Sequence, residues 1–311
     1  MKAIVLKEAG NVENLEYVEL EKPTISSGQV LVKVKAISIN PVDVKSRAGK
    51  GVYGRIKKEN PLILGWDIAG IVEETQSSDF KVGDEVFGMI NFPGHGKAYA
   101  EYVAAPANQL ALKPQNITFE DAAASTLVAL TAYQALVHNA DVQQGQTVLV
   151  HAASGGVGHI AVQIAKHLGA KVTGTSSAKN KDFVLGLGAD SHIDYHGFDW
   201  GSAGRTFDFV LDTIGGENID HSLEVTKEGG SIISIPTGLN EEVTSKAESK
   251  GVKGYFILVQ SNGEDMKQIA SLLKSGAIKP HVSKTFPFEQ MREAHLEQET
   301  GRTVGKIVIT L

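Results

Sequence analysis

The stretch that decides the fold is His151–Ser177, HAASGGVGHIAVQIAKHLGAKVTGTSS. It overlaps Gln146–Ala152 (QTVLVHA), a short apolar and β-branched run that is typical of a buried parallel strand. A Gly-rich turn follows, then a segment with apolar residues at helical spacing that ends at Gly169, and then Lys171–Thr175 as a second strand. This order of elements predicts a βαβ unit of a parallel sheet.

The turn Ala153–Gly158 (ASGGVG) fits the dinucleotide fingerprint G-x-G-x-x-G, with Ala153 in the first glycine place. Gly155 would let the backbone approach a pyrophosphate, and Gly158 would let the helix pack closely on the strand. The N-terminus of that helix offers N–H groups and the positive end of a dipole to a phosphate. Because both strands and the helix accompany the glycines, the pattern favours a dinucleotide site over a tight turn without a ligand.

The end of the second strand indicates which dinucleotide binds. An NAD site usually places an Asp or Glu there, about 20 residues after the glycines. This chain has Gly174–Ser177 (GTSS) there, and its first carboxylate is Asp182. Lys179 and Lys181 follow the hydroxyls, and either lysine alone could equally be an ordinary surface charge. Small hydroxyls beside lysines suit a 2′-phosphate, so we expect NADP(H) rather than NAD(H).

Composition narrows the functional classes. The 311 residues are enough for two domains, and a net charge of −6 without a basic stripe argues against a nucleic-acid partner. The absence of cysteine excludes disulfides, a thiol nucleophile and cysteine-ligated zinc. The N-terminal MKAIVLKEAG lacks the apolar core of a signal peptide, and no apolar run approaches the ~20 residues that span a bilayer. We therefore expect a cytoplasmic protein without a membrane partner.

Residues 1–122 are predicted to form a small β-barrel domain, because short strand-like runs alternate with turns. These runs are Lys2–Leu6, Leu15–Leu20, Val30–Ser38, Ile68–Glu74, Glu85–Ile90 and Ala98–Ala104. The polar, Gly-rich segment Lys50–Asn60 is expected to be a mobile loop.

From Phe119 the period changes, and Phe119–Asn139 is predicted to be helical. Strands and helices then alternate, which predicts an α/β domain with a doubly wound parallel sheet at 123–280. The elements expected there are strands Phe207–Thr213, Ser231–Ile235 and Tyr255–Val259 and helices Asn218–Lys227 and Met266–Ser275. A final strand, Thr303–Thr310, has no obvious place in that sheet, so the segment 281–311 is expected to return to the barrel.

Several motifs spread over the chain resemble those of the medium-chain dehydrogenase/reductase superfamily. Besides the Gly-rich turn, they are Asn40–Arg47 (NPVDVKSR), Leu64–Gly70 (LGWDIAG), Val82–Gly88 (VGDEVFG), Ala98–Tyr102 (AYAEY) and Gly301–Lys306 (GRTVGK). Within the superfamily the chain is similar to zinc-independent quinone oxidoreductases and alkenal reductases. The resemblance implies a Rossmann sheet with a GroES-like barrel, and NADP(H)-dependent reduction of quinones, enals or enones. It also implies a homodimer, for which the outer strand near Tyr255–Val259 is the predicted contact.

Zinc-dependent relatives carry a Cys where this chain has Asn40, a His where it has Trp66, and a four-Cys lobe that is absent here. No pair of His residues at i, i+4 on a predicted helix replaces these ligands. Without a Lewis acid, hydride addition to an electrophilic carbon is easier than oxidation of a simple alcohol. No metal site is therefore predicted. Two alternatives stay open: a zinc alcohol dehydrogenase, and a nucleotide-binding or structural protein that has lost turnover.

The resemblance also implies a set of site residues. The pyrophosphate would be held by Ser154, Gly155, Gly156, Val157 and Gly158, and the 2′-phosphate by Ser176, Lys179 and Tyr195. The nicotinamide end would be approached by Asn40, Thr131, Ile214 and Phe256, and the cleft completed by Asn262 and Arg302. Ile214 follows a predicted strand, at the edge where open α/β sheets bind ligands.

A proton or hydrogen-bond donor is needed where negative charge grows on a reduced carbonyl. Lys45 is one candidate and Asn40 another, although many quinone oxidoreductases have Tyr at the position of Lys45. Asp43 is expected to order the Asn40 loop, Arg47 to pair with Asp43, and Trp66 to lie in the core.

Overall fold

The computed structural model describes all residues, 1–311, and the chain divides into two compact units. Unit 1 comprises Met1–Leu130 and Val259–Leu311, and unit 2 comprises Thr131–Leu258. The sequence-based boundary at 280 differs from the division at Val259, because helix α9 (Gly263–Ser275) packs against β7 (Ala111–Leu112) of unit 1.

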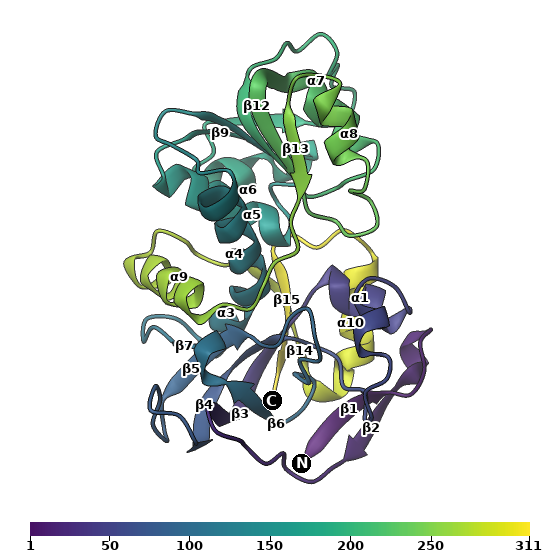
Figure 1. The fold of residues 1–311 in the computed structure, drawn as a ribbon, viewed down its shortest axis with the longest axis vertical. Coiled ribbons are helices and arrows are strands. Elements are labelled where there is room, and N and C mark those ends of the chain that lie inside the picture. The colour runs from purple at the N-terminus through teal and green to yellow at the C-terminus, as the bar shows by residue number, and fades with distance from the viewer. The chain divides into compact units, whose positions relative to one another are not determined.

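Unit 2 is built on a six-stranded parallel sheet in the order β10-β9-β8-β11-β12-β13. Its strands are β8 (Thr147–Val150), β9 (Lys171–Ser176), β10 (Ser191–Asp194), β11 (Phe207–Asp212), β12 (Thr226–Ser234) and β13 (Lys253–Phe256). Its helices are α5 (Gly156–His167), α6 (Lys181–Gly186), α7 (Asn218–Val225) and α8 (Val243–Glu248). Figure 1 shows α5 and α6 on one face of the sheet and α7 and α8 on the other. The doubly wound parallel sheet is therefore as predicted.

The strand order places a switch point at β8. The chain proceeds from β8 to β9 and β10 on one side, and through β11, β12 and β13 on the other. Because all pairings are parallel, the carboxyl ends of the six strands share one edge. Open α/β sheets bind their ligands at such an edge, beside the switch point.

Unit 1 contains a seven-stranded sheet in the order β14-β15-β3-β4-β5-β7, with β6 paired to β3, and a separate β1-β2 hairpin. The strands are β1 (Lys2–Leu6), β2 (Leu15–Glu19), β3 (Gln29–Ile39), β4 (Asp67–Thr75), β5 (Glu85–Met89), β6 (Tyr102–Pro106), β14 (Val282–Pro287) and β15 (Lys306–Thr310). The C-terminal strand β15 runs antiparallel to β3, with Ile307 opposite Ile39, and parallel to β14 (Figure 1). The predicted return of the C-terminus to the first domain is therefore confirmed.

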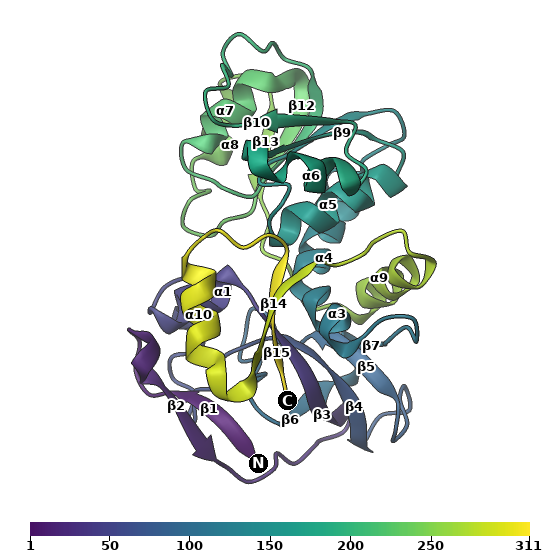
Figure 2. The same ribbon diagram turned by 180° about the vertical axis from the view of Figure 1, so that it is seen from behind.

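Two helices of unit 1 lie side by side, although they are far apart in sequence. Helix α1 (Pro41–Arg47) contacts α10 (Met291–Glu299), as Figure 2 shows. None of the helices in either unit combines the length and the apolar character that crossing a membrane requires.

The stretch Phe119–Asn139 is helical, as predicted, but it is divided into α3 (Phe119–Ala124), α4 (Thr126–Tyr133) and a π-helix, η3 (Gln134–Asn139). At the break the hydroxyls of Ser125 and Thr126 donate to the carbonyl oxygens of Asp121 and Ala123, at 2.7 and 3.0 Å. Such side-chain bonds compete with the helix for its own acceptors.

The predicted loop Lys50–Asn60 contains a short helix, α2 (Tyr53–Ile56). Ile56 is buried, and burial of this apolar side chain holds the segment against unit 1.

Candidate active site

The Gly-rich turn of unit 2 has the geometry of a phosphate cradle. Helix α5 begins directly after Gly155, and no side chain caps its N-terminus. The N–H groups of its first turn have no partner within the helix, so they are available to an anion. A Cβ on Gly158 would lie 2.2 Å from the carbonyl oxygen of Ala152, so only glycine lets α5 lie this close to the turn. The residues present therefore fit a dinucleotide pyrophosphate.

Three predicted residues, Ser154, Ile214 and Phe256, lie in this turn or at the neighbouring strand ends. Ser154 is mostly buried, and its Oγ accepts a hydrogen bond from the Asn180 side chain at 3.1 Å. Ile214 lies two residues after the end of β11 and is 41% exposed. Phe256 is the last residue of β13 and is 58% exposed. Two apolar side chains are thus presented to solvent at the ligand-binding edge of the sheet. Thr131 lies on α4 and is buried.

The residues predicted for the 2′-phosphate gather at the ends of β9 and β10. Ser176 ends β9, and its carbonyl oxygen accepts from the N–H of Tyr195, which follows β10. The half-exposed Tyr195 ring stacks on His196, with centroids 4.1 Å apart. Lys179 lies exposed on the short helix η4 (Ala178–Asn180).

Sequence reasoning missed a histidine at this edge. The Nε2 of His192, on β10, lies 2.8 Å from the Oγ of Ser176. Burial lowers the pKa of His192, with Asp194 opposing and Lys181 adding to the shift. The contact depends on the register of β10 with β9, where His192 lies opposite Gly174, and no pattern in the sequence gives that register.

A second histidine, His151, is buried and supports the base of the turn. Its ring nitrogens lie 3.2 Å from the Thr175 hydroxyl and 3.1 Å from the Ser222 hydroxyl. Burial lowers the pKa of His151 to about 4, with the charge of Asp212 opposing this. His151 is therefore neutral at physiological pH. Asp212 in turn accepts the N–H of Ile214 at 3.0 Å and so fixes the loop after β11.

In unit 1 the predicted residue Asn40 is fully buried, directly before α1. Its Nδ2 donates to the Asp67 carboxylate at 2.8 Å, and its Oδ1 accepts from the ammonium of Lys306. The amide of Asn40 thus belongs to a polar cluster inside unit 1. Lys45, on α1, is half-buried, and burial lowers its pKa.

Several predicted contacts near α1 can be checked. The carboxylate of Asp43 accepts the backbone N–H of Asn40 at 2.8 Å, so Asp43 does order this turn, as expected. The expected pairing of Arg47 with Asp43 was wrong, since Arg47 pairs with Glu299 on α10, the helix beside α1. Trp66 is fully buried, as predicted, and its Nε1 donates to the carbonyl oxygen of Gly94 at 2.7 Å.

The last two predicted residues also lie in unit 1. The side-chain oxygen of Asn262 accepts the N–H groups of Glu264 and Asp265 at 2.9 and 3.1 Å, and so caps α9. Arg302 is exposed in the segment between α10 and β15.

The buried cluster around Asn40 was not predicted from the sequence, and it contains three ionisable groups. Burial and the charge of Asp67 raise the pKa of Asp43 to about 7, and burial also raises the pKa of Asp67. Burial lowers the pKa of Lys306 to about 8, which the two carboxylates oppose. Beside the cluster, the Tyr99 hydroxyl lies 2.9 Å from Nε2 of His295.

This donor set does not fit a zinc ion at Asn40. The only side-chain oxygen of Asn40 already accepts a hydrogen bond from the Lys306 ammonium. The Trp66 side chain is a hydrogen-bond donor and has no metal-binding atom. No group of three or more His, Cys, Asp or Glu side chains in the structure is arranged to hold a metal ion.

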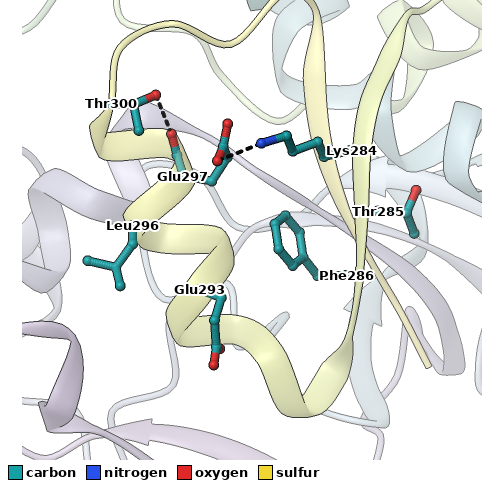
Figure 3. Close-up of a pocket in the computed structure, with 7 residues that line it drawn as sticks. All are labelled: Lys284, Thr285, Phe286, Glu293, Leu296, Glu297 and Thr300. Atoms are coloured by element: carbon teal, nitrogen blue, oxygen red, sulfur yellow. Dashed lines mark hydrogen bonds and ion pairs between the residues drawn. The ribbon is translucent and has the colours of Figure 1, made fainter.

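A separate groove lies on unit 1 between β14 and α10 (Figure 3). It is lined by Lys284, Thr285, Phe286, Glu293, Leu296, Glu297 and Thr300. Lys284 pairs with Glu297 across it at 2.8 Å. None of the predicted site residues lies in this groove, so it is not part of the candidate site.

Unit 2 contains a parallel sheet with a dinucleotide-binding turn, and unit 1 is a β-domain that includes the C-terminal strand. This combination defines a two-domain dehydrogenase or reductase. Family models agree: one for the alcohol dehydrogenase GroES-like domain matches residues 26–115, and one for zinc-binding dehydrogenases matches residues 187–309. The chain belongs to the medium-chain dehydrogenase/reductase superfamily, as its motifs suggested.

Individual relatives are similar over most of their length. The chain is 35% identical to a 2-methylene-furan-3-one reductase of Solanum lycopersicum and 34% identical to a chloroplastic NADPH-dependent alkenal/one oxidoreductase of Arabidopsis thaliana. Each match covers 99% of this chain and 79% of the relative. The solved structure of the quinone oxidoreductase from Coxiella burnetii superposes with a TM-score of 0.94 at 36% identity, covering 100% of this chain and 99% of that one.

Proposed function

We propose that the protein is a zinc-independent, NADPH-dependent reductase of quinones and of α,β-unsaturated carbonyl compounds such as enals and enones. The observation that carries the proposal is the edge of the unit 2 sheet, where an uncapped helix N-terminus lies beside a strand end with hydroxyls and no carboxylate. The relatives named for alkenal/one and quinone reduction support the substrate class.

The turn from Ser154 to Gly158 would hold the pyrophosphate through backbone N–H groups and the dipole of α5. Ile214 and Phe256 are exposed apolar side chains at the same edge and suit a nicotinamide ring. Thr131 is proposed as a further contact of that ring. NADPH, when bound, supplies the hydride that reduces the substrate.

The 2′-phosphate would be bound at the ends of β9 and β10. Lys179 is exposed and forms no ion pair in the structure, so its charge is available to a phosphate. The Ser176 hydroxyl is held by His192, and the ring of Tyr195 is held by stacking on His196. An Asp or Glu at Ser176 would repel the phosphate, and its absence favours NADPH over NADH.

Lys45 is proposed as the donor for the substrate carbonyl. When hydride adds to the β-carbon of an enone, negative charge grows on the carbonyl oxygen and requires a donor. Burial lowers the pKa of Lys45, which makes its ammonium a better acid near neutral pH. Asn40 is buried among its own partners, so its proposed role is to hold α1 rather than to contact substrate. Asn262 and Arg302 are proposed to flank the site.

We further propose a cytoplasmic homodimer without nucleic-acid or membrane partners. Strand β13 is the outer strand of the unit 2 sheet, so its free edge could pair with the same strand of a second copy around a two-fold axis.

The test is NADPH oxidation by the purified protein with quinones, enals and enones, alongside NAD(P)⁺ reduction with simple alcohols and metal analysis. We expect turnover with the electrophilic acceptors, none with alcohols, and no bound zinc. Lys45→Met should lower kcat roughly 10²-fold, the usual contribution of a positioned acid or base, with NADPH affinity unchanged. Tight NADPH binding with equal inertness of wild type and variant would instead identify a binding protein without turnover. Zinc-dependent alcohol oxidation would contradict the proposal.

A further inference from the structure

One of the two buried lysines of unit 1, Lys306, has no part in the reaction described so far. Lys306 begins β15 and is 3% exposed. Its ammonium donates to the carbonyl oxygen of Ile39 at 2.6 Å and to Oδ1 of Asn40. Lys306 therefore joins the C-terminal strand to the residue that immediately precedes α1, across 266 positions of sequence.

We propose that Lys306 is a positioning residue for reduction, which anchors Asn40 and thereby fixes the helix α1 that carries Lys45. The proposal rests on the function proposed above for Lys45. It assigns no proton transfer to Lys306 itself, because its ammonium is enclosed and bonded to groups of the protein.

Helix α1 needs such an anchor because it is only seven residues long. Isolated helices of this length are not stable in water, so packing and end contacts determine where they lie. The N-terminal end is fixed by Asn40, which donates its backbone N–H to Asp43 and its amide N–H to Asp67. Asp67 in turn accepts the N–H of Leu127 at 3.1 Å, which ties the same group to α4.

The charges around Lys306 explain why an ammonium suits this place. Asp43 faces it from α1 and Asp67 from β4, and both carboxylates are buried. Three further groups lie near the cluster. Tyr99 interacts with Asp43 as well as with His295, and Arg47 is paired with Glu299. A buried charge is tolerated only when it is paired and hydrogen-bonded, so removal of Lys306 would leave two carboxylates without a cation.

The test compares three variants as purified full-length proteins: Lys306→Met, the double variant Lys306→Met with Asp67→Asn, and Lys284→Met. Lys284 is the matched control, because it is a paired but exposed lysine on the adjacent strand β14 (Figure 3). We expect Lys306→Met to lower kcat at least tenfold, to leave the Kd for NADPH within threefold, and to speed amide hydrogen exchange in residues 41–47 at least tenfold. Lys284→Met should match wild type in all three measurements.

The exchange measurement needs no substrate and separates this proposal from the proposed function. If wild type reduces no quinone or enone, the proposed function fails, and the exchange rates still decide whether Lys306 anchors α1. Wild-type exchange in 41–47 of Lys306→Met would overturn the anchor. Faster exchange with wild-type kcat would overturn the link to reduction. Should Lys306→Met fail to fold, the double variant, which leaves one fewer uncompensated charge, decides by the same criteria.

Discussion

Replacement of Gly158 or of Gly155 in the turn by alanine should have different effects on the stability of the protein. A Cβ on Gly158 would lie 2.2 Å from the Ala152 carbonyl oxygen, whereas ordinary van der Waals contact begins near 3.4 Å, so the backbone must move by about 3.4 − 2.2 = 1.2 Å. A Cβ on Gly155 would meet the same oxygen at 3.2 Å, where a few tenths of an ångström suffice, and its φ of −83° suits alanine.

The energies follow from these distances. Alanine within a helix is favoured over glycine by about 1 kcal/mol, while overpacking costs roughly 1–3 kcal/mol. Gly158→Ala should therefore lower the free energy of unfolding by up to about 2 kcal/mol and displace the turn. Gly155→Ala should leave stability near wild type but place a methyl group where the pyrophosphate approaches. Loss of one hydrogen bond to a charged group, about 1.5–3 kcal/mol, corresponds to a roughly 10- to 150-fold higher Kd for NADPH in both variants.

Urea unfolding gives the stabilities, and fluorescence titration with NADPH gives the affinities. Gly186→Ala, in α6, is the control, because a Cβ there meets no atom within 4 Å, and neither quantity should fall. Wild-type stability of Gly158→Ala would refute the packing argument. Wild-type NADPH affinity of Gly155→Ala would refute the assignment of the turn as the pyrophosphate site.

Three further predictions concern the strand ends and the buried histidine of unit 1. Ser176→Asp should shift the ratio of kcat/KM for NADPH over NADH towards NADH by at least 100-fold; an unchanged ratio would remove the 2′-phosphate from this edge. His192→Phe loses the 2.8 Å contact to Ser176, worth about 1 kcal/mol, so the Kd for NADPH should rise about fivefold while that for NADH stays constant in parallel titrations. Burial lowers the pKa of His295 to about 3, so between pH 6.5 and 3 the unfolded chain binds a proton that the folded chain does not. Stability should therefore fall as pH drops through this window, and urea unfolding of His295→Gln, which can still bond Tyr99, should show a shallower fall.

The unit 2 sheet could be predicted because its signals are local. The apolar run of β8, the glycines after it and the helical spacing up to Gly169 lie within one short segment, and each element has its own period. The absence of a carboxylate at the end of β9, where Ser176 stands, can likewise be read from the sequence of one short segment. Boundaries were less predictable: Val259–Leu311 joins unit 1 as a whole because α9 packs on β7, a contact between segments about 150 residues apart.

The missed features are those set by tertiary pairing. His192 reaches Ser176 only through the register of two parallel strands, and Arg47 finds Glu299 because α10 lies beside α1. A hydrophobic pattern specifies which face of an element is buried, but not which polar group it meets there. Sequence reasoning therefore paired Arg47 with its nearest acidic neighbour, Asp43, and was wrong.

Asn40 illustrates how a substitution at one position changes the chemistry of a whole site. An amide offers one acceptor and two donor hydrogens, and here the acceptor is bonded to the Lys306 ammonium while a donor is bonded to the Asp67 carboxylate. Asn40 thus bridges a buried cation and a buried anion by hydrogen bonds, which requires a neutral side chain that both accepts and donates. A thiolate has no donor, and beside Asp67 it would add negative charge that a divalent metal, rather than one ammonium, would have to balance. The residue at this position and the cation that accompanies it are therefore linked, and the asparagine belongs with the lysine of the returning strand.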